Sequence, residues 1–302
     1  MDREVQFVGV PADYGANRRG VDMGPSAIRY AGLAAAVGSI CPNCVDAGDL
    51  SVERAENADP DRAPLDDRAK FLREIQDVST RLADRVAAVC TADGLPIVLG
   101  GDHSVAIGTL AGASRDADLG VVWFDAHGDF NTPSTTPSGN VHGMSLAAAL
   151  GRDEFGDLPW AQAPGLEPEN VAIVGARSLD DGERAALQDS AVSVYTMTEI
   201  DARGIVDVVV DALEVATDGT DGIHVSLDLD WLDPKEAPGV GTPVRGGVTY
   251  REAHAALEAV ASTPAPLRSM EVVEVNPVLD SHNETAELAC ELVASALGER
   301  TI

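Results

Sequence analysis

The chain contains seven short apolar runs separated by segments of helical periodicity, and this alternation restricts its fold more than any other feature. The runs are VQFVGV, LPIVLGG, LGVVWFDAHGD, NVAIVGA, VSVYTM, GIHVSLDLD and LRSMEVVEV. Several are almost continuously apolar, which is typical of strands covered on both faces. Helical spacing occurs in DRAKFLREIQDVSTRLADRVAAVCTADG, SLAAALG, GERAALQ and EAHAALEAVAST. The pattern predicts a three-layer α/β/α fold around a mostly parallel sheet.

Residues 1–302 are expected to form one domain. A length of 302 residues allows one large α/β domain or two ordinary ones, and no repeat or low-complexity block divides the chain. Residues 51–69 are the only linker-like stretch, which we interpret as an acidic surface loop. No apolar run approaches the ~20 residues that span a bilayer, and no signal peptide is visible. A cytoplasmic protein is therefore expected.

The formal net charge is −29, from 50 acidic and 21 basic residues. Such a surface repels nucleic acid and anionic membranes, so neither is expected as a partner. It would attract cationic ligands, although salt would screen that attraction. Nearly all basic residues are arginine, with Lys70 and Lys235 as the exceptions. Because acid-rich, lysine-poor surfaces suit halophilic proteins, we favour salt adaptation as the origin of the charge and infer no substrate from it.

Two of the four cysteines, Cys41 and Cys44, lie in the motif CPNC. This spacing occurs in redox and zinc motifs, but no second close pair completes a four-cysteine site. A plain loop is favoured for this pair, with a metal or redox role as the lesser alternative. Cys90 and Cys290 lie in apolar, helix-like stretches and are expected in the core.

Acidic and histidine side chains follow four of the apolar runs. In parallel α/β sheets, ligands bind beyond the carboxyl ends of the strands, so these side chains are candidates for one site. In an extended chain, side chains two residues apart point to the same face, so alternate residues of each motif would point to one side of the sheet. The candidates are Asp102 and His103 in GGDHS, Asp125, His127 and Asp129 in FDAHGD, Asp228, Asp230 and Asp233 in SLDLDWLDP, and Glu274 in EVNP.

The candidates together predict a binuclear metal site. Burying several carboxylates costs free energy unless cations neutralise them. Oxygen and nitrogen donors without thiolate suit Mn²⁺, and paired metals activate water between them. Taken singly, each motif has an ordinary explanation, because D-x-D is often a helix cap and GGDHS can be a turn. Their joint occurrence at several strand ends favours the metal.

The other three histidines are not expected in this site. His224 shares strand parity with Asp228, but four residues of strand separate them by ~13 Å. We interpret His224 as a core histidine. His254 lies in a helix-like run and His282 in a surface segment, and neither is assigned a role.

With these motifs in place, the chain resembles the ureohydrolases, and within them the arginases. The similarity runs from GVPADYGANRRGVDMGPSAIRYAGL to MEVVEVNP, and GGDHS, DAHxD and SxDxDxxDP match the metal motifs of the family. The resemblance implies hydrolysis of L-arginine to L-ornithine and urea by a metal-bridging hydroxide. It also implies two Mn²⁺ ions per subunit and a homo-oligomer, either trimer or hexamer.

The resemblance also implies roles for the candidate residues. One Mn²⁺ would be held by His103, Asp125, Asp129 and Asp228, and the other by Asp125, His127, Asp228 and Asp230. Asp129 would accept a hydrogen bond from the attacking group and pass a proton to the leaving amine. Glu274 would hold the guanidinium group, and His142 would shuttle protons.

The loop NTPSTTPSGNVHG resembles the arginase version of this segment. Asn131 and Ser138 would contact the substrate α-carboxylate, with Thr136 nearby. Asp180 and Glu183 in GARSLDDGE would face the α-amino group, and Thr242 in GTPVRGG would line the pocket. The chain departs from the common pattern at Ser178, where aspartate is frequent, and at Asp181, where proline is frequent.

Two kinds of alternative to arginine hydrolysis remain, namely another ureohydrolase activity and a protein without catalysis. Agmatinase, guanidinobutyrase and formimidoylglutamase share the metal motifs, so only the substrate loop separates them from arginase. Proline and hydroxyl residues also suit any surface loop, and Asn131 could simply stabilise a turn. A catalytically inactive metal-binding regulator is a more remote alternative, because none of the expected ligands is missing.

Overall fold

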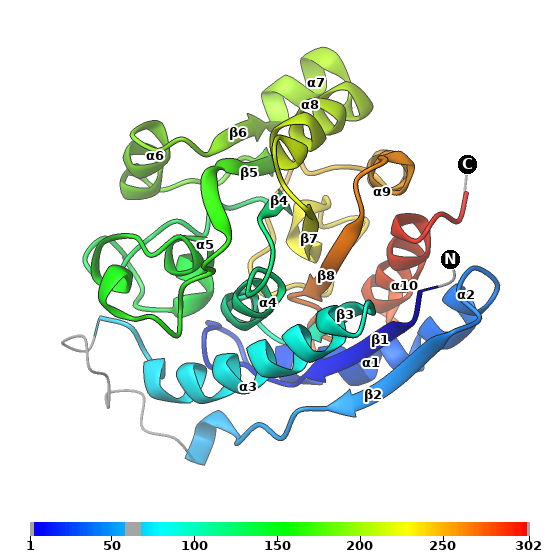
Figure 1. The fold of residues 1–302 in the computed structure, drawn as a ribbon, viewed down its shortest axis with the longest axis horizontal. Coiled ribbons are helices and arrows are strands. Elements are labelled where there is room, and N and C mark those ends of the chain that lie inside the picture. The colour runs from blue at the N-terminus through cyan, green and yellow to red at the C-terminus, as the bar shows by residue number, and fades with distance from the viewer. Residues whose placement is uncertain (1–2, 58–67, 301–302) are drawn as a thin grey trace.

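In the part of the chain that the structure describes, eight strands form one sheet in which every strand pairing is parallel (Figure 1). The spatial order is β2-β1-β3-β8-β7-β4-β5-β6. All seven apolar runs of the sequence contribute strands, so the expectation of a largely parallel sheet is confirmed. The strands are β1 (Val5–Val10), β2 (Cys44–Asp49), β3 (Leu95–Gly100), β4 (Leu119–Phe124), β5 (Leu166–Ala176), β6 (Ser193–Thr196), β7 (Gly222–Asp228) and β8 (Leu267–Val273).

The computed structural model describes residues 3–57 and 68–300. Most of the acidic loop expected over 51–69 therefore lies outside the described residues. Within the described ranges, no helix has both the length and the apolar character that crossing a membrane requires.

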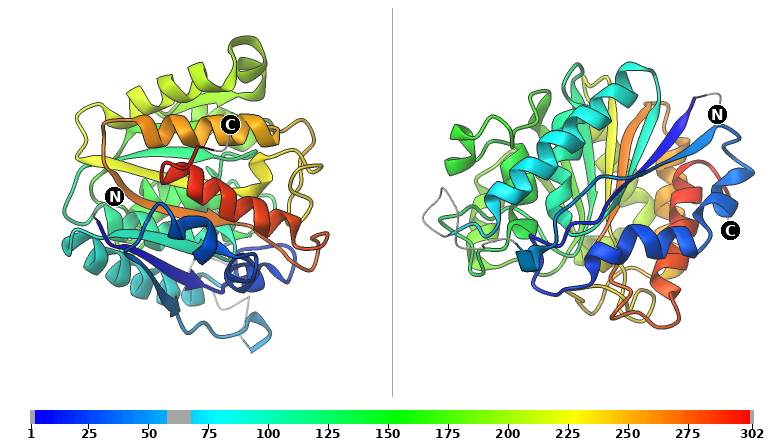
Figure 2. Two further views of the ribbon diagram at one scale, coloured as in Figure 1. Left: turned by 90° about the vertical axis from the view of Figure 1, so that its right-hand side faces the viewer. Right: turned by 90° about the horizontal axis from the view of Figure 1, so that it is seen from below.

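Helices cover both faces of the sheet (Figure 2). One face packs against α3 (Leu72–Thr91), α4 (Ala106–Ala113) and α5 (Ser145–Ala149). The other packs against α1 (Gly24–Tyr30), α2 (Leu33–Gly38), α8 (Ile205–Thr217), α9 (Tyr250–Ser262) and α10 (Glu284–Ala296). Near β6, the chain forms α6 (Asp181–Gln188) and α7 (Met197–Arg203). The three-layer arrangement agrees with the sequence prediction.

The central strands are apolar along their whole length because both of their faces are buried. In β4, Val122 and Phe124 join the core under α8 and α9, whereas Val121 and Trp123 join the core under α3 and α4. All of these side chains are 0% exposed. The alternation of two inward faces explains why no polar-apolar pattern is visible in the run LGVVWF.

The interpretation of CPNC as a loop is largely confirmed, since Cys41 to Asn43 form a turn between α2 and β2. Cys41 is buried in this turn, and Cys44 begins the edge strand β2, which was not predicted. All four cysteines are free thiols. The strand was missed because CVDAGD is largely exposed, so it lacks the apolar character that marks the strands at the centre of the sheet.

The four strands that precede the polar motifs are neighbours in the sheet. They lie in the order β3-β8-β7-β4, although they are far apart in the sequence. Because all four strands are adjacent and parallel, their carboxyl ends lie side by side near the centre of the sheet. The motifs that follow these strands, GGDHS, EVNP, SLDLD and FDAHGD, therefore lie close together.

Close packing between β4 and α8 gives a test of this arrangement. A Cβ added at Gly120 would lie 1.6 Å from the backbone oxygen of Ala216. Gly120→Ala is expected to lower the free energy of unfolding by about 1–3 kcal/mol, because helix and strand must separate. Urea denaturation would measure this. The matched control is Gly38→Ala, where a Cβ meets nothing within 4 Å; equal midpoints for the two variants would contradict the packing argument.

Candidate metal centre and adjoining cavity

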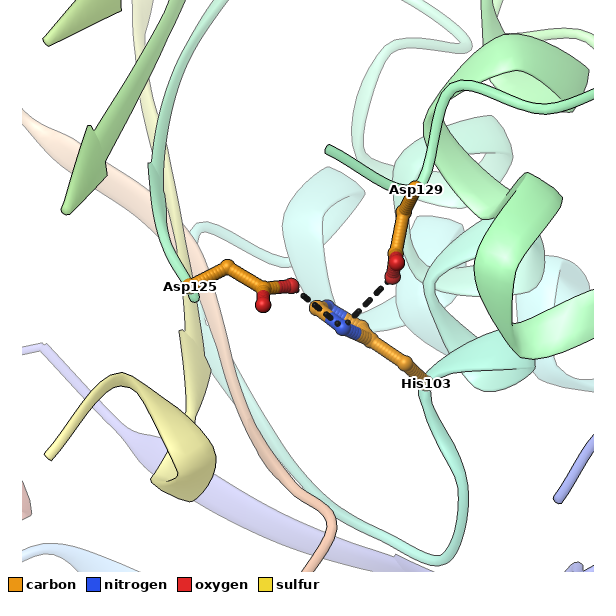
Figure 3. Close-up of side chains that lie close together, drawn as sticks. All are labelled: His103, Asp125 and Asp129. Atoms are coloured by element: carbon orange, nitrogen blue, oxygen red, sulfur yellow. Dashed lines mark ion pairs between the residues drawn. The ribbon is translucent and has the colours of Figure 1, made fainter. Parts of the chain in front are cut away.

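Three carboxylate oxygens surround one nitrogen of His103, and Figure 3 shows those of Asp125 and Asp129. Its Nδ1 lies 3.2 Å from Asp125 Oδ2, 2.9 Å from Asp129 Oδ2 and 3.1 Å from Asp228 Oδ2. All four residues are buried. The segments following β3, β4 and β7 thus supply one compact set of nitrogen and oxygen donors.

A second set lies beside the first. His127 Nδ1 is 3.0 Å from Asp230 Oδ2 and 3.4 Å from Asp125 Oδ1. Asp125 therefore directs one carboxylate oxygen to each histidine. The two sets share this carboxylate, as expected of a bridging ligand between two cations.

The backbone reaches this geometry by bends rather than by continued strands. The expectation that Asp125, His127 and Asp129 share the face of an extended chain is not met, because β4 ends at Phe124 and Asp129 has φ of 47°. Likewise, β7 ends at Asp228, and its Oδ1 accepts a hydrogen bond from the N–H of Asp230 in a short 3-10 turn. The donors still converge, because the bends turn alternate side chains inward.

Burial and crowding shift the pKa values of these groups strongly. Burial lowers the pKa of His103, but the carboxylates of Asp129, Asp125 and Asp228 outweigh burial and raise that pKa well above its usual value. Burial, together with Asp230 and Asp125, raises the pKa of Asp228 well above its usual value. Burial and Asp125 raise the pKa of Asp129 to about 6. So many acidic groups in one buried space need positive charge among them.

The donor set fits divalent cations. His103 Nδ1 makes no hydrogen bond of acceptable geometry to any described group, although three carboxylate oxygens lie near it. Donor atoms of His103, Asp125 and Asp129 lie within 4.8 Å of one another, as do those of Asp125, His127 and Asp230. Imidazole and carboxylate donors without thiolate are typical of hard to borderline divalent metals.

His142 and Glu274 form a second pair next to this cluster. His142 Nδ1 lies 3.1 Å from Glu274 Oε1, which also accepts a hydrogen bond from the backbone N–H of His103. Burial raises the pKa of Glu274, but His142 more than offsets it, so the net shift is downward. Burial lowers the pKa of His142, and Glu274 raises it to about 9 overall. Glu274 has φ of 65°, and strained backbone conformations of this kind are most frequent at functional sites.

A cavity of about 200 Å³ opens above the cluster. It brings together most of the residues predicted from the sequence, but His103, Asp125 and Glu274 are not among the residues that line it. The lining residues are His127, Asp129, Asn131, Thr136, Pro137, Ser138, His142, Gly143, Ser178, Asp180, Glu183, Asp228, Asp230 and Thr242. One wall is thus rich in metal donors and the other in amide, hydroxyl and carboxylate groups.

The irregular loop after Phe130 is joined to the start of α6. Asn131 Nδ2 donates to Asp180 Oδ2 at 2.8 Å, and Glu183 Oε1 accepts a hydrogen bond from the Phe130 N–H. Asp180 and Glu183 also form the capping box of α6. Burial and Asp129 raise the pKa of Glu183 to about 7. These bonds hold the two acidic residues beside the loop that precedes His142.

The remaining loop residues have distinct local partners. Thr136 Oγ1 accepts from the backbone N–H of Gly139, and Ser138 Oγ accepts from the N–H of Asn140. Thr242 Oγ1 donates to Asp230 Oδ2 at 2.8 Å, so it contacts the metal-donor set directly. Asp102, predicted as a candidate from GGDHS, is buried and accepts hydrogen bonds from the N–H groups of Gly15 and Ser104. It supports the backbone at this site.

Two supporting residues were not identified from the sequence. Trp123 stacks on His103 with ring centroids 4.3 Å apart and donates from Nε1 to Asp125 Oδ2 at 3.0 Å. Arg177 donates to the backbone oxygens of Asp230, Trp231, Leu232, Val244 and Gly175. Their position beside the motifs was the only available signal: Trp123 lies two residues before Asp125, and Arg177 directly follows β5.

The structure separates the other histidines from the cluster, as predicted. His224 is fully buried and contacts Ser269 and Glu271 rather than the carboxylate cluster. His254 is buried in α9, where its Nδ1 contacts Ser295 Oγ at 2.8 Å. His282 is exposed.

The chain is similar along its whole length to proteins of one family. The model of the Arginase family matches residues 3–298. An arginase from Bacillus subtilis is 47% identical over 305 residues, covering all of both chains. The structure of an arginase from Bacillus caldovelox superimposes with a TM-score of 0.92 at 44% identity, covering 99% of this chain and 100% of that one. An Entamoeba histolytica arginase in complex with L-ornithine gives 0.88 at 30% identity, with the same coverage.

The contribution of the hydrogen bonds from Arg177 to protein stability can be tested by substitution. Arg177→Lys is expected to destabilise the protein by about 1–3 kcal/mol, because an ammonium group cannot reach the same spread of carbonyl oxygens and leaves several unpaired. Arg184→Lys, an exposed change in the neighbouring helix, is the control and should be near neutral. Thermal denaturation would compare them, and an unaffected Arg177→Lys would show that the carbonyl contacts contribute little.

Proposed function

The chain belongs to the arginase family, and we propose that it hydrolyses the guanidinium group of L-arginine to L-ornithine and urea. The observation that carries the proposal is the cavity that joins the buried His/Asp cluster to the Asn131–Ser138 loop. Agmatinase and the other ureohydrolase activities are not favoured, because arginases at 41–47% identity cover essentially the whole chain.

We propose Mn²⁺ as the native metal, with two ions per subunit. His103, Asp125, Asp129 and Asp228 would hold one ion, and Asp125, His127, Asp228 and Asp230 the other. The short distances among these donors and the mixture of imidazole and carboxylate support the assignment. When bound, such a pair of ions would lower the pKa of a water molecule, which could then attack the unreactive guanidinium carbon at neutral pH.

The protein side chains would position the substrate and move protons. Asp129 lines the cavity, so its carboxylate can accept a hydrogen bond from the attacking water and pass the proton to the leaving amine. Glu274 does not line the cavity but contacts His142, which does, and it would offer the charge complementary to the guanidinium group. His142 lines the cavity and, with its pKa raised to about 9, holds a proton that it can deliver.

The opposite wall would recognise the amino acid end of the substrate. Asn131 and Ser138, with Thr136 nearby, offer donors to the α-carboxylate, and Asp180 and Glu183 offer negative charge to the α-amino group. The amide of Asn131 uses one N–H on Asp180, which leaves its second N–H for a ligand. Thr242 would line the pocket near Asp230.

Several wider expectations accompany this proposal. We propose that residues 1–302 act as one domain, since one sheet carries both halves of the core. A homo-oligomer, a cytoplasmic location and a salt-adapted surface stay predictions from the sequence.

The substrate is tested by the release of urea from a panel of guanidino compounds. Metal-free protein reloaded with Mn²⁺ should prefer L-arginine to agmatine, because a site built to bind the carboxylate leaves polar groups unpaired with the analogue that lacks it. Guanidinobutyrate and formiminoglutamate complete the panel, and reloading with Zn²⁺ or Mg²⁺ tests the metal. Preference for agmatine would refute the arginase assignment but keep the wider ureohydrolase chemistry.

The proton-transfer role is tested with Asp129→Asn. The amide keeps the shape of the side chain but cannot accept and pass a proton, so kcat should fall by about 10²-fold or more. Asp181→Asn, an exposed change on α6, is the matched control and should retain activity. The metal content of both variants must be measured alongside. Near-normal turnover in Asp129→Asn would exclude this role.

A further inference from the structure

A row of polar side chains crosses the core next to the buried His/Asp cluster. His224 and Ser226 on β7 pair in register with Ser269 and Glu271 on β8. All four are 0% exposed. The alternate residues of β7, namely Ile223, Val225 and Leu227, belong to the apolar core on the opposite face. Only the face under α4 is polar.

The direction of hydrogen bonding in this row is determined by chemistry. Ser226 Oγ donates to Glu271 Oε1 at 2.9 Å, since an ionised carboxylate can only accept. The same Oγ lies 2.7 Å from His103 Nε2. Having donated its one hydrogen to Glu271, the hydroxyl must accept from the Nε2–H of His103. The bond therefore leaves the proton of a neutral His103 on Nε2.

This choice of tautomer has a direct consequence at the cluster. With hydrogen on Nε2, Nδ1 of His103 presents its lone pair, and Nδ1 is the atom surrounded by Asp125, Asp129 and Asp228. The hydroxyl also fixes the plane of the imidazole ring from behind, on the side away from the cluster. Partners of this kind determine both the orientation and the basicity of a histidine ligand.

Glu271 has one further neighbour in this row. His224 Nε2 lies 3.4 Å from Glu271 Oε1, and His224 is itself positioned by Ser269, whose Oγ lies 2.8 Å from its Nδ1. Burial raises the pKa of Glu271, but the contact with His224 more than offsets it, so the net shift is downward. A buried polar row is costly where apolar residues of similar volume could pack, so stability alone does not explain it.

We propose that Ser226 and Glu271 are positioning residues that orient His103 and select its metal-binding tautomer, with His224 holding Glu271 in place. The inference rests on the two-metal assignment of the proposed function. It gives His224 a supporting role beyond that of a packed core residue, although it lies outside the metal site itself. It also predicts that the two metal positions respond differently to changes in this row, because the row contacts His103 but not His127.

The test measures Mn²⁺ binding to metal-free protein by isothermal titration calorimetry, without substrate. Ser226→Ala should weaken one of the two Mn²⁺ sites by about 10–100-fold and leave the other much less affected. Glu271→Gln, which keeps the side-chain volume but removes the fixed direction of donation, should weaken the same site. Ser295→Ala is the matched control: it also removes a buried hydroxyl that lies 2.8 Å from a histidine Nδ1, but far from the cluster.

A double-mutant cycle distinguishes positioning from general loss of stability. In a His103→Ala background, Ser226→Ala should cause no further loss of Mn²⁺ affinity, because its effect passes through His103. The inference is overturned if Ser226→Ala and Glu271→Gln bind both ions as tightly as the wild type, or if the loss is additive with His103→Ala. Failure of the proposed function would instead show as a wild type that binds two ions but releases no urea from arginine.

Discussion

The concentration of buried negative charge at one edge of the sheet is the constraint on which the rest of the structure depends. Asp125, Asp129, Asp228 and Asp230 lie together beside two histidines. Burial, together with the charges of Asp230 and Asp125, raises the pKa of Asp228 well above its usual value. Carboxylates this close are stable only with cations or protons among them. A fold that keeps them together must hold their backbone rigidly, and the four adjacent parallel strands do so.

Rigidity at this edge comes from the layers behind it. Hydrogen bonds of Arg177 hold the chain after β7, Trp123 packs on His103, and the Ser226–Glu271 pair supports the same histidine from the core. These contacts are made by residues within the sheet or directly beyond it. The side chains of the cluster therefore have little freedom to rearrange, which favours a preformed metal site over one assembled by the ion.

Much of the fold was predictable because burial leaves a strong pattern in the sequence. The central strands are apolar on both faces, and motifs after them had to meet at one edge. The edge strand β2 was missed because its exposed residues carry no such pattern. The extended-face argument for Asp125 to Asp129 was wrong, since a left-handed Asp129 depends on tertiary contacts. Arg177 and Glu271 were also beyond reach, because their roles arise from partners distant in the sequence.

The two walls of the cavity differ in how they are built, and this bears on how the family can vary its substrates. The metal wall is tied to strand ends and to the core, so changing it would disturb the sheet. The opposite wall is a loop joined to α6 through Asn131, Asp180 and Glu183, with few links to the sheet. Substitutions there are expected to disturb the fold little. If the proposed recognition of the substrate holds, the donor cluster belongs to the scaffold, whereas substrate choice depends on the contacts between one loop and the start of α6.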